Sequence, residues 1–126
     1  MSEDSYSLSR ATFEVRLMCD QLRLSDAAGT TTPEQEREYR LRRAALAQRH
    51  LAATAITRSD PQEAREDAEL TATMLWKHDT LHGGHRGPLP ATHPHWKASN
   101  LGDYVRQEAD VADLRACRSS PRSPWR

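Results

Sequence analysis

The sequence predicts an all-α fold: a four-helix bundle-like domain built on a central antiparallel helical hairpin, with a disordered basic C-terminal tail. Two strong helix starts, each with a capping residue before Pro33 or Pro61, mark two long helices separated by a short joint. Apolar residues recur at three- and four-residue steps, and no stretch alternates cleanly enough to form a strand. We therefore expect one helical domain at residues 1–118 and a tail at 119–126.

The central hairpin is expected to consist of helices at 33–58 and 61–82. Thr32 provides a hydroxyl N-cap for the first helix, with a glutamine three residues later to complete a capping box. Asp60 provides a carboxylate N-cap for the second helix. A helix cannot easily run through Pro61, because proline has no N–H to donate and restricts the residue before it. Two long helices with so short a joint are most simply folded back on each other.

Charge also favours the pairing of these two helices. The first helix carries more arginines than acids, whereas the second carries more acids than basic residues. Opposite charges on neighbouring helices attract, although each exposed pair contributes only about 0–1 kcal/mol. The charge distribution therefore favours the hairpin, but it contributes less to the prediction than the helix starts do.

A further helix is expected on each side of the hairpin. At 8–24 an apolar seam recurs every three or four residues and a second stripe flanks it, so this helix is expected to contact more than one partner. The seam consists of Leu8, Ala11, Val15, Met18 and Leu22, and the flanking stripe of Phe13, Leu17 and Leu24. Residues 1–6 are expected to fray. A last helix is expected at 101–117, with Asn100 as its N-cap.

The connecting segment 83–99 differs in composition from the helices. It contains three glycines, three prolines and no acidic residue. Connections longer than about 12–15 residues without secondary structure are usually either functional or disordered. Both interpretations stay open from the sequence.

The amino-acid composition limits which partners and what size of core the chain can have. The 126 residues include equal numbers of acidic and basic side chains, so no overall field draws the chain to nucleic acid or to a membrane. Thirteen leucines, three valines, one isoleucine and one phenylalanine stand beside seventeen alanines. Alanine favours helix but buries little area, which predicts a lean core that dimerisation would complete.

The expected location is cytoplasmic. No segment approaches the roughly 18 apolar residues of a membrane span, and the acidic start Met1-Ser2-Glu3-Asp4 has no apolar core after it. Cys19 and Cys117 lie far apart in the sequence, and free thiols in a reducing compartment are expected.

Histidines make the segment 78–95 the main candidate for a metal site. Five of the six histidines lie there: His78, His82, His85, His93 and His95. His78 and His82 are four residues apart near a helix end and therefore share one face. Neutral imidazole is the commonest protein ligand for zinc, copper and nickel. The hypothesis is a site for zinc or another divalent transition metal, with Asp79 as a ligand or as a partner of a ligand.

A purely structural interpretation of these histidines competes with the metal site. His78 lies on the apolar stripe of its helix and is more simply explained as a core-edge histidine bonded to a carbonyl. The loop histidines are more simply explained as solvated residues of a flexible connector. No H-E-x-x-H or E-x-x-H motif occurs, and neither cysteine is near.

Other catalytic interpretations rest on fewer residues. Glu63 and Glu66 have E-x-x-E spacing and resemble the magnesium-binding pair of the all-α nucleotide pyrophosphatases. That family needs a second acidic pair, which is missing here because Glu108 is followed three residues later by a valine, so a solvated acidic face explains the pair better. A second catalytic hypothesis is Cys19 as a nucleophile with His50 as its base. An inert buried thiol is the simpler interpretation of Cys19.

The loop 82–87 is a further candidate, for binding phosphate through its backbone amides. It follows a helix, so the N-terminal helix dipole that makes such loops effective is absent.

Three functions follow from these features. The first is a small helical protein-binding or assembly module without chemistry of its own, which would bind a protein partner or form a homo-oligomer. The second is a metal-binding protein or metal-dependent enzyme that uses the histidines at 78–95. The third is a weak nucleic-acid-binding regulator that uses the arginines and Trp125 of the tail, whose few charges would lose affinity quickly with salt.

Overall fold

The computed structural model describes the backbone of residues 2–54 and 60–119, and the side chains of 8–54 and 60–112. Its helices are α1 (Ser2–Ala28), α2 (Pro33–Ala52), α4 (Pro61–His82), a short 3₁₀ helix η1 (Ala98–Asn100) and α5 (Leu101–Ser119). No strand occurs in the described ranges. The predicted all-α fold is confirmed.

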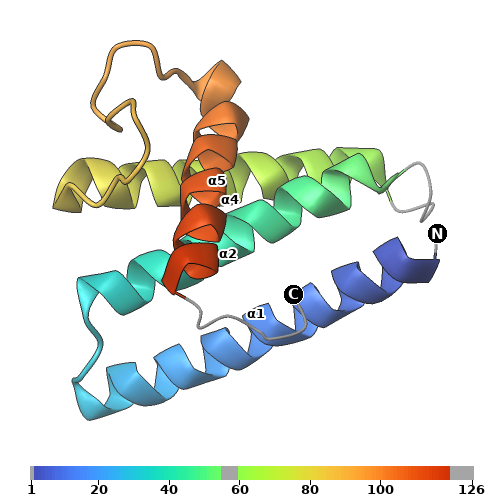
Figure 1. Cartoon of the computed structure of the whole chain (residues 1–126), viewed down its shortest axis with the longest axis horizontal. Helices are drawn as coiled ribbons and strands as arrows, with labels where there is room; N and C mark the ends of the chain where they lie inside the picture. The colour runs from blue at the N-terminus through green and yellow to red at the C-terminus, as the bar shows by residue number, and fades with distance from the viewer. Residues whose placement is uncertain (1, 55–59, 120–126) are drawn as a thin grey trace.

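The central hairpin is also confirmed. α2 and α4 run side by side in opposite directions and pack against each other more extensively than any other pair of elements (Figure 1). α1 lies along the other side of α2, whereas α5 crosses α2 and α4 instead of running along them. The arrangement is bundle-like around the hairpin, with α5 laid across it.

The predicted caps fix the start of both hairpin helices. Thr32 Oγ1 accepts from the Gln35 amide at 3.1 Å, and Gln35 Oε1 accepts from the Thr32 amide at 2.9 Å, which completes the capping box. Asp60 Oδ1 accepts from the Gln62 amide at 3.0 Å. At the other end of α4, Gly83 has φ 67° and its amide donates to the Asp79 carbonyl at 2.7 Å.

The first helix is longer than predicted. α1 spans Ser2–Ala28 instead of 8–24, so residues 2–6, which were expected to fray, are helical in the structure. Its opening turn carries Glu3 and Asp4, which the helix dipole favours but which give no apolar signal. Gly29, with φ 71°, ends the helix four residues past the predicted end, and the amides of Gly29 and Thr30 donate to the carbonyls of Asp26 and Ser25.

The second helix ends earlier than predicted. α2 stops at Ala52, and Ala53 has φ −93° and ψ 0°, outside helical geometry. Thr54 Oγ1 donates to the Leu51 carbonyl at 2.9 Å, a side-chain bond that competes with continuation of the helix. Most of the remaining predicted helix, residues 55–58, lies outside the described residues.

The start of α5 differs from the prediction in one respect. The Asn100 side chain bonds to the residues before it instead of capping α5. It accepts from the Lys97 amide at 2.7 Å and donates to the His95 carbonyl at 2.9 Å. It therefore closes the preceding loop. α5 continues to Ser119, past its predicted end at residue 117. The rest of the predicted disordered tail, 120–126, lies outside the described residues.

The loop after α4 is part of the core. Trp76 Nε1 donates to the Ala91 carbonyl at 2.8 Å, and Trp96 Nε1 donates to the Pro90 carbonyl at 2.9 Å. Ala91 and Trp96 are buried between the loop and the helices. The buried apolar cluster consists of Leu41, Ala44, Ala72, Leu75, Ala91, Trp96, Leu101, Tyr104 and Val105. It joins α2, α4, the loop and α5.

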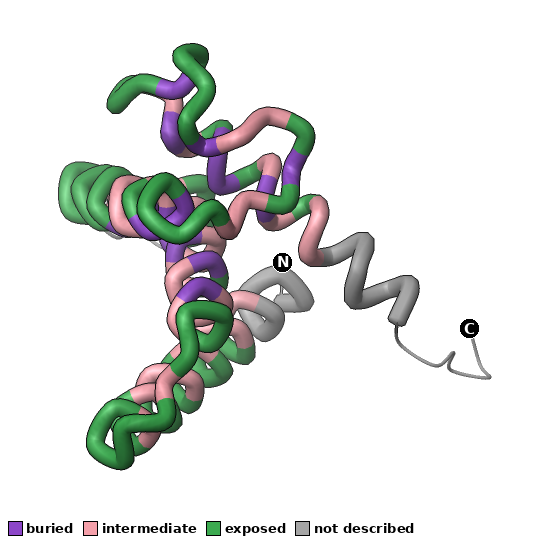
Figure 2. Tube along the Cα trace, turned by 90° about the vertical axis from the view of Figure 1, so that its left-hand side faces the viewer, coloured by how far each residue is buried: buried purple, intermediate pink, exposed green. Residues whose placement is uncertain are grey.

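The first helix stands apart from this core. None of the described side chains of α1, residues 8–28, is buried, and Figure 2 shows α1 in pink and green only over that range. α1 packs against α2 with its predicted seam, which is half-buried along its length. The compact part of the molecule is therefore built without α1.

Among the helices in the described ranges, none combines the length and the apolar content that crossing a bilayer requires.

Candidate functional site

The core contains a cluster of charged and polar side chains, which we call the polar cluster. It consists of Arg37, Asp79, Tyr104 and Glu108, of which the most exposed is Arg37 at 8%. Arg37 donates to the two oxygens of Asp79 at 2.7 and 2.9 Å, and to Glu108 Oε1 at 2.6 Å. Tyr104 donates its hydroxyl proton to Asp79 Oδ2 at 2.5 Å. The cluster joins α2, α4 and α5.

Glu108 also holds the loop after α4. Its two carboxylate oxygens accept from the backbone amides of Arg86, at 2.7 Å, and Gly87, at 2.9 Å, and Gln107 Nε2 donates to it at 2.7 Å. The amides considered for phosphate binding therefore bind an anion, but the anion is a side chain of the protein itself. An external phosphate at this position would have to displace Glu108.

Two loop glycines allow this close packing. A Cβ atom at Gly84 would lie 3.0 Å from Arg37 Cδ, and one at Gly87 would lie 2.3 Å from Gln107 Cγ. Glycine lets the loop backbone approach the side chains of Arg37 and Gln107 this closely, because a Cβ atom would have to push them aside. The glycines of this loop thus serve packing, in addition to ending α4.

The electrostatics of the cluster keep its donors protonated. Burial lowers the pKa of Arg37, but the hydrogen bonds and charges of Asp79 and Glu108 raise it by more, so the guanidinium stays charged. Burial, and then the hydrogen bond to Asp79, raises the pKa of Tyr104 well above its usual range. With every member bonded to another, the polar cluster is suited to fixing the helices and the loop in one arrangement.

Sequence reasoning did not identify Arg37, Tyr104 or Glu108 as partners. A signal was present: Arg37 lies one turn before Leu41 on the core-facing stripe of its helix, and Tyr104 and Glu108 are four residues apart on one face of α5. A charged residue on an apolar stripe is almost never fully buried unless it is paired.

The predicted metal ligands fall into two groups. His78 and His82 lie together on α4, with ring centroids 4.4 Å apart. His93 and His95 lie in the loop, where His93 Nδ1 accepts from the His95 amide at 3.0 Å and the His95 ring packs edge-on against Trp96 at 4.8 Å.

The remaining loop histidine, His85, is half-buried. In the described part of the chain, no group of three or more His, Cys, Asp or Glu side chains is arranged to hold a metal ion. The metal site built from all five histidines stays a prediction.

His78 occupies an unusual environment. Its side chain is 6% exposed, and neither ring nitrogen makes a hydrogen bond. Nε2 lies 3.7 Å from Glu36 Oε1 and Nδ1 lies 3.8 Å from Asp79 Oδ1. The carbonyl partner considered for His78 from the sequence is not observed. Burial, and then the nearby His82, lowers the pKa of His78, although the carboxylates of Glu36 and Asp79 oppose this shift.

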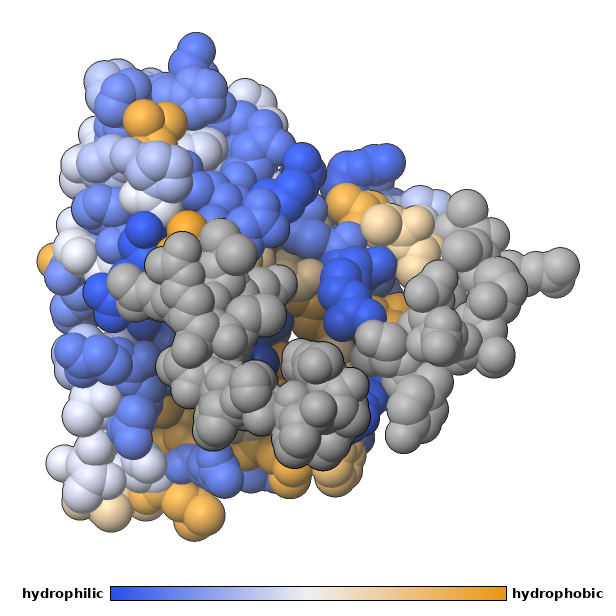
Figure 3. Space-filling view, in the orientation of Figure 1, coloured by the Kyte–Doolittle hydropathy of each residue, from blue (hydrophilic) through white to orange (hydrophobic). Residues whose placement is uncertain are grey.

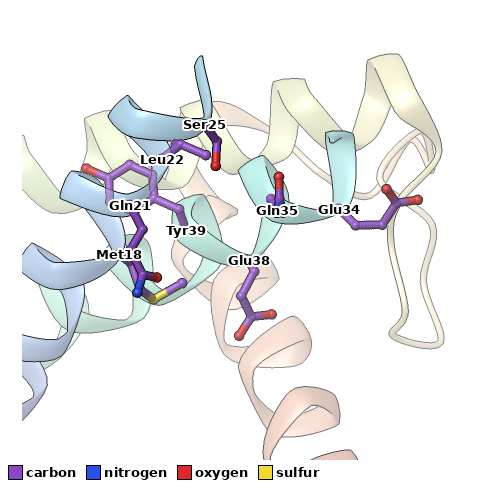
Figure 4. Close-up of a pocket in the computed structure, with 8 residues that line it drawn as sticks. All are labelled: Met18, Gln21, Leu22, Ser25, Glu34, Gln35, Glu38 and Tyr39. Carbon is purple, nitrogen blue, oxygen red and sulfur yellow. The ribbon is translucent and has the colours of Figure 1, made fainter. Parts of the chain in front are cut away.

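A groove of about 310 Å³ separates α1 from α2 (Figure 4). It is lined by Met18, Gln21, Leu22, Ser25, Glu34, Gln35, Glu38 and Tyr39. Burial, and then a contact with Cys19, raises the pKa of Tyr39. The groove mixes apolar and polar side chains, and its presence shows that α1 does not pack tightly on α2.

The remaining catalytic hypotheses gain no support from the geometry. Cys19 is half-buried and contacts Tyr39, whereas the hydrogen bond observed for His50 is with Thr12, at 3.3 Å. The E-x-x-E pair on α4 is exposed to solvent, as the solvated-face interpretation expects. Cys117 lies outside the described side chains.

Comparison with known protein families, curated proteins and solved structures finds no match to this chain.

Proposed function

We propose that this chain is a small helical protein-binding or assembly module and that α1 carries its docking face. The observation that supports the proposal most directly is an apolar stripe on α1, where Phe13, Leu17 and Leu24 are 60, 46 and 73% exposed. Figure 3 shows apolar residues gathered along the lower edge of the molecule, where α1 runs. Apolar side chains gathered on one helix face mark interaction surfaces more often than scattered ones do.

The weak attachment of α1 supports the same proposal. A helix whose seam is only half-buried gains little from its contact with α2. Because most helical stability in proteins comes from packing of an apolar face, a 27-residue helix with no buried side chain over 8–28 is incompletely partnered. A partner laid along α1 would cover the exposed stripe.

We propose that a second copy of the chain is the partner that covers this stripe. A two-fold contact would cover the same stripe on both copies. Fully burying a Phe or Leu side chain contributes about 1.5–3 kcal/mol, so covering the exposed part of each would contribute about 1–2 kcal/mol. The three side chains on each of two copies together contribute about 6–12 kcal/mol, which is comparable with the association cost of about 4–15 kcal/mol, so the contact must extend along the rest of α1 to give a dimer at micromolar concentration.

Sedimentation of the full chain tests this proposal. The wild type is expected to sediment as a dimer at micromolar concentration, and the double variant Phe13→Glu/Leu17→Glu as a monomer. Leu70→Glu is the matched control, because Leu70 is a similarly exposed leucine, 55%, on α4 instead of α1. Circular dichroism confirms that each variant keeps its helical content.

Two outcomes would contradict the proposal. One is a wild-type chain that stays monomeric across the micromolar range. The other is a Leu70→Glu variant that dissociates as readily as the α1 variant, which would place the contact elsewhere on the surface.

We further propose a cytoplasmic location, which is supported by Cys19 as a free thiol in the described part of the chain. The nucleic-acid hypothesis stays a prediction, because seven residues of its basic tail, 120–126, lie outside the described residues. Unchanged DNA retention after deletion of residues 118–126 would exclude it.

A further inference from the structure

The end of α4 contains a buried imidazole that the protein leaves without a hydrogen bond. His78 is 6% exposed on its side chain, and neither Nδ1 nor Nε2 has a partner. Buried polar atoms are nearly always bonded, and an exception calls for an explanation such as a bound ion. His78 is therefore available to bind a group that the chain itself does not supply.

The surroundings of His78 favour a metal ion as that group. Two ligand atoms bound to one zinc ion, each at about 2.0–2.1 Å, lie roughly 3.3–4 Å apart. The 3.7 Å between His78 Nε2 and Glu36 Oε1 is in that range, and is too long for a hydrogen bond. On the other side of the ring, Nδ1 faces Asp79 Oδ1 at 3.8 Å. That distance is also too long for a hydrogen bond, so Asp79 does not fix the orientation of the His78 ring in this conformation.

His82 is the candidate for a third ligand. It lies one turn after His78, its ring centroid is 4.4 Å away, and its side chain is exposed. An exposed side chain changes rotamer within nanoseconds, so the ring of His82 is free to turn toward the space between Nε2 and Glu36. In the conformation described the three donors are not arranged as a metal site, so metal binding requires this rotation.

We propose that His78, His82 and Glu36 form a binding site for zinc or another divalent transition metal, where the start of α2 meets the end of α4. The site uses two of the five histidines that the sequence singled out and adds a carboxylate from the neighbouring helix. Two imidazoles and a carboxylate are a known zinc ligand set that leaves one coordination position open.

The local charge is compatible with a cation. Arg40 binds Glu36 Oε2 at 2.8 Å, which leaves Oε1 free to face His78. Counting the side chains around the site, the three carboxylates of Glu36, Asp79 and Glu108 exceed the two guanidinium groups of Arg37 and Arg40 by one. The C-terminal end of α4 also favours positive charge through the helix dipole.

The protonation state of His78 is compatible as well. Burial and the neighbouring His82 lower its pKa, so the imidazole is neutral at neutral pH. A neutral imidazole keeps a lone pair for a metal, as every histidine ligand must.

Titration of the untagged full chain with Zn²⁺ tests the proposal, by calorimetry and by the visible absorption of Co²⁺ in its place. The wild type is expected to bind one equivalent. His82→Ala and Glu36→Gln, each at an exposed or half-exposed position, are expected to weaken binding by roughly 10-fold or more. His85→Ala is the matched control and is expected to bind as the wild type does, since it changes a histidine outside the site.

Three results would overturn the proposal. The first is a wild-type chain that binds neither metal. The second is unchanged binding in both His82→Ala and Glu36→Gln while circular dichroism shows them folded. The third is an equal loss in His85→Ala, which would place the metal in the loop. None of these variants touches the exposed stripe of α1, so the result is independent of the proposed docking face.

Discussion

Arg37 and Asp79 join the start of α2 to the end of α4 through two hydrogen bonds, of 2.7 and 2.9 Å, between one guanidinium group and one carboxylate. The two residues are 42 positions apart in the sequence, and at 8 and 1% exposure they lie inside the core. Planar two-point pairing of this kind fixes geometry as well as charge. The hairpin is thus locked at its open end, opposite the joint before Pro61.

Removing the cation of the polar cluster is expected to destabilise the fold strongly. Arg37→Met leaves the carboxylates of Asp79 and Glu108 buried without their counter-charge, and breaking a buried pair in this way costs about 3–5 kcal/mol. Asp79→Asn is expected to cost less, because Arg37 keeps Glu108 as a partner. Urea unfolding followed by circular dichroism measures both free energies.

A surface pair provides the control for that measurement. Arg42 donates to Glu38 at 2.7 Å, but both side chains are about half exposed. Arg42→Gln is therefore expected to cost only about 0–1 kcal/mol. If Arg37→Met unfolds at the same urea concentration as Arg42→Gln, the polar cluster does not hold the fold together.

Glu108 is expected to control the order of the loop after α4. In Glu108→Gln the amides of Arg86 and Gly87 lose a charged acceptor, and bonds to charged groups are the stronger ones. Hydrogen exchange at these two amides is expected to become faster than in the wild type, while exchange at the centre of α2 changes less. Equal acceleration at both places would indicate global destabilisation instead of a local role.

Local signals account for the part of the fold that the sequence predicted. Thr32, Asp60 and Gly83 form their capping hydrogen bonds with residues within about one turn of themselves. Their roles as caps can therefore be predicted from the adjacent sequence. The hairpin follows from them. The ends of α1 were missed because residues 2–6 and 25–28 carry no large apolar spacing, while Glu3 and Asp4 favour helix at its start and Ala27 and Ala28 favour helix at its end.

The candidate site was less predictable, because its contacts are not local. Glu108 meets Arg37 across 71 positions, and no spacing rule links two residues so far apart. The histidine cluster illustrates the same limit. Proximity in sequence suggested five ligands, whereas the packing of α2 on α4 places Glu36 beside His78. Composition likewise left open whether the loop after α4 is functional or disordered, and the hydrogen bonds donated by the indoles of Trp76 and Trp96 fix its backbone.

The close approach of the loop to α5 predicts a large effect of one methyl group. Gly87→Ala would place a Cβ atom 2.3 Å from Gln107 Cγ, so the loop or the glutamine must move, and overpacking costs about 1–3 kcal/mol. Gly102→Ala is the control: its Cβ would lie 3.3 Å from a flexible glutamine amide, inside a helix that alanine favours. Thermal unfolding is expected to show a lower Tm for Gly87→Ala and little change for Gly102→Ala. A Tm for Gly87→Ala at or above the wild type would contradict the close packing.

Stability at alkaline pH is expected to depend on Tyr104. Burial, and then its bond to Asp79, raises the pKa of Tyr104 above the ordinary value of 10.0, so the folded protein keeps the phenol proton while the unfolded chain releases it. The stabilisation is therefore complete below pH 10 and is lost as the pH rises above it, by up to about 1.4 kcal/mol per pH unit. Tyr104→Phe removes this titration, so its stability is expected to fall less between about pH 9 and 11 than that of the wild type, although it starts lower because the hydrogen bond is gone. Urea unfolding at each pH measures the two slopes. Parallel slopes would show that the phenol ionises equally in the folded and unfolded states, and that the contact with Asp79 does not hold its proton.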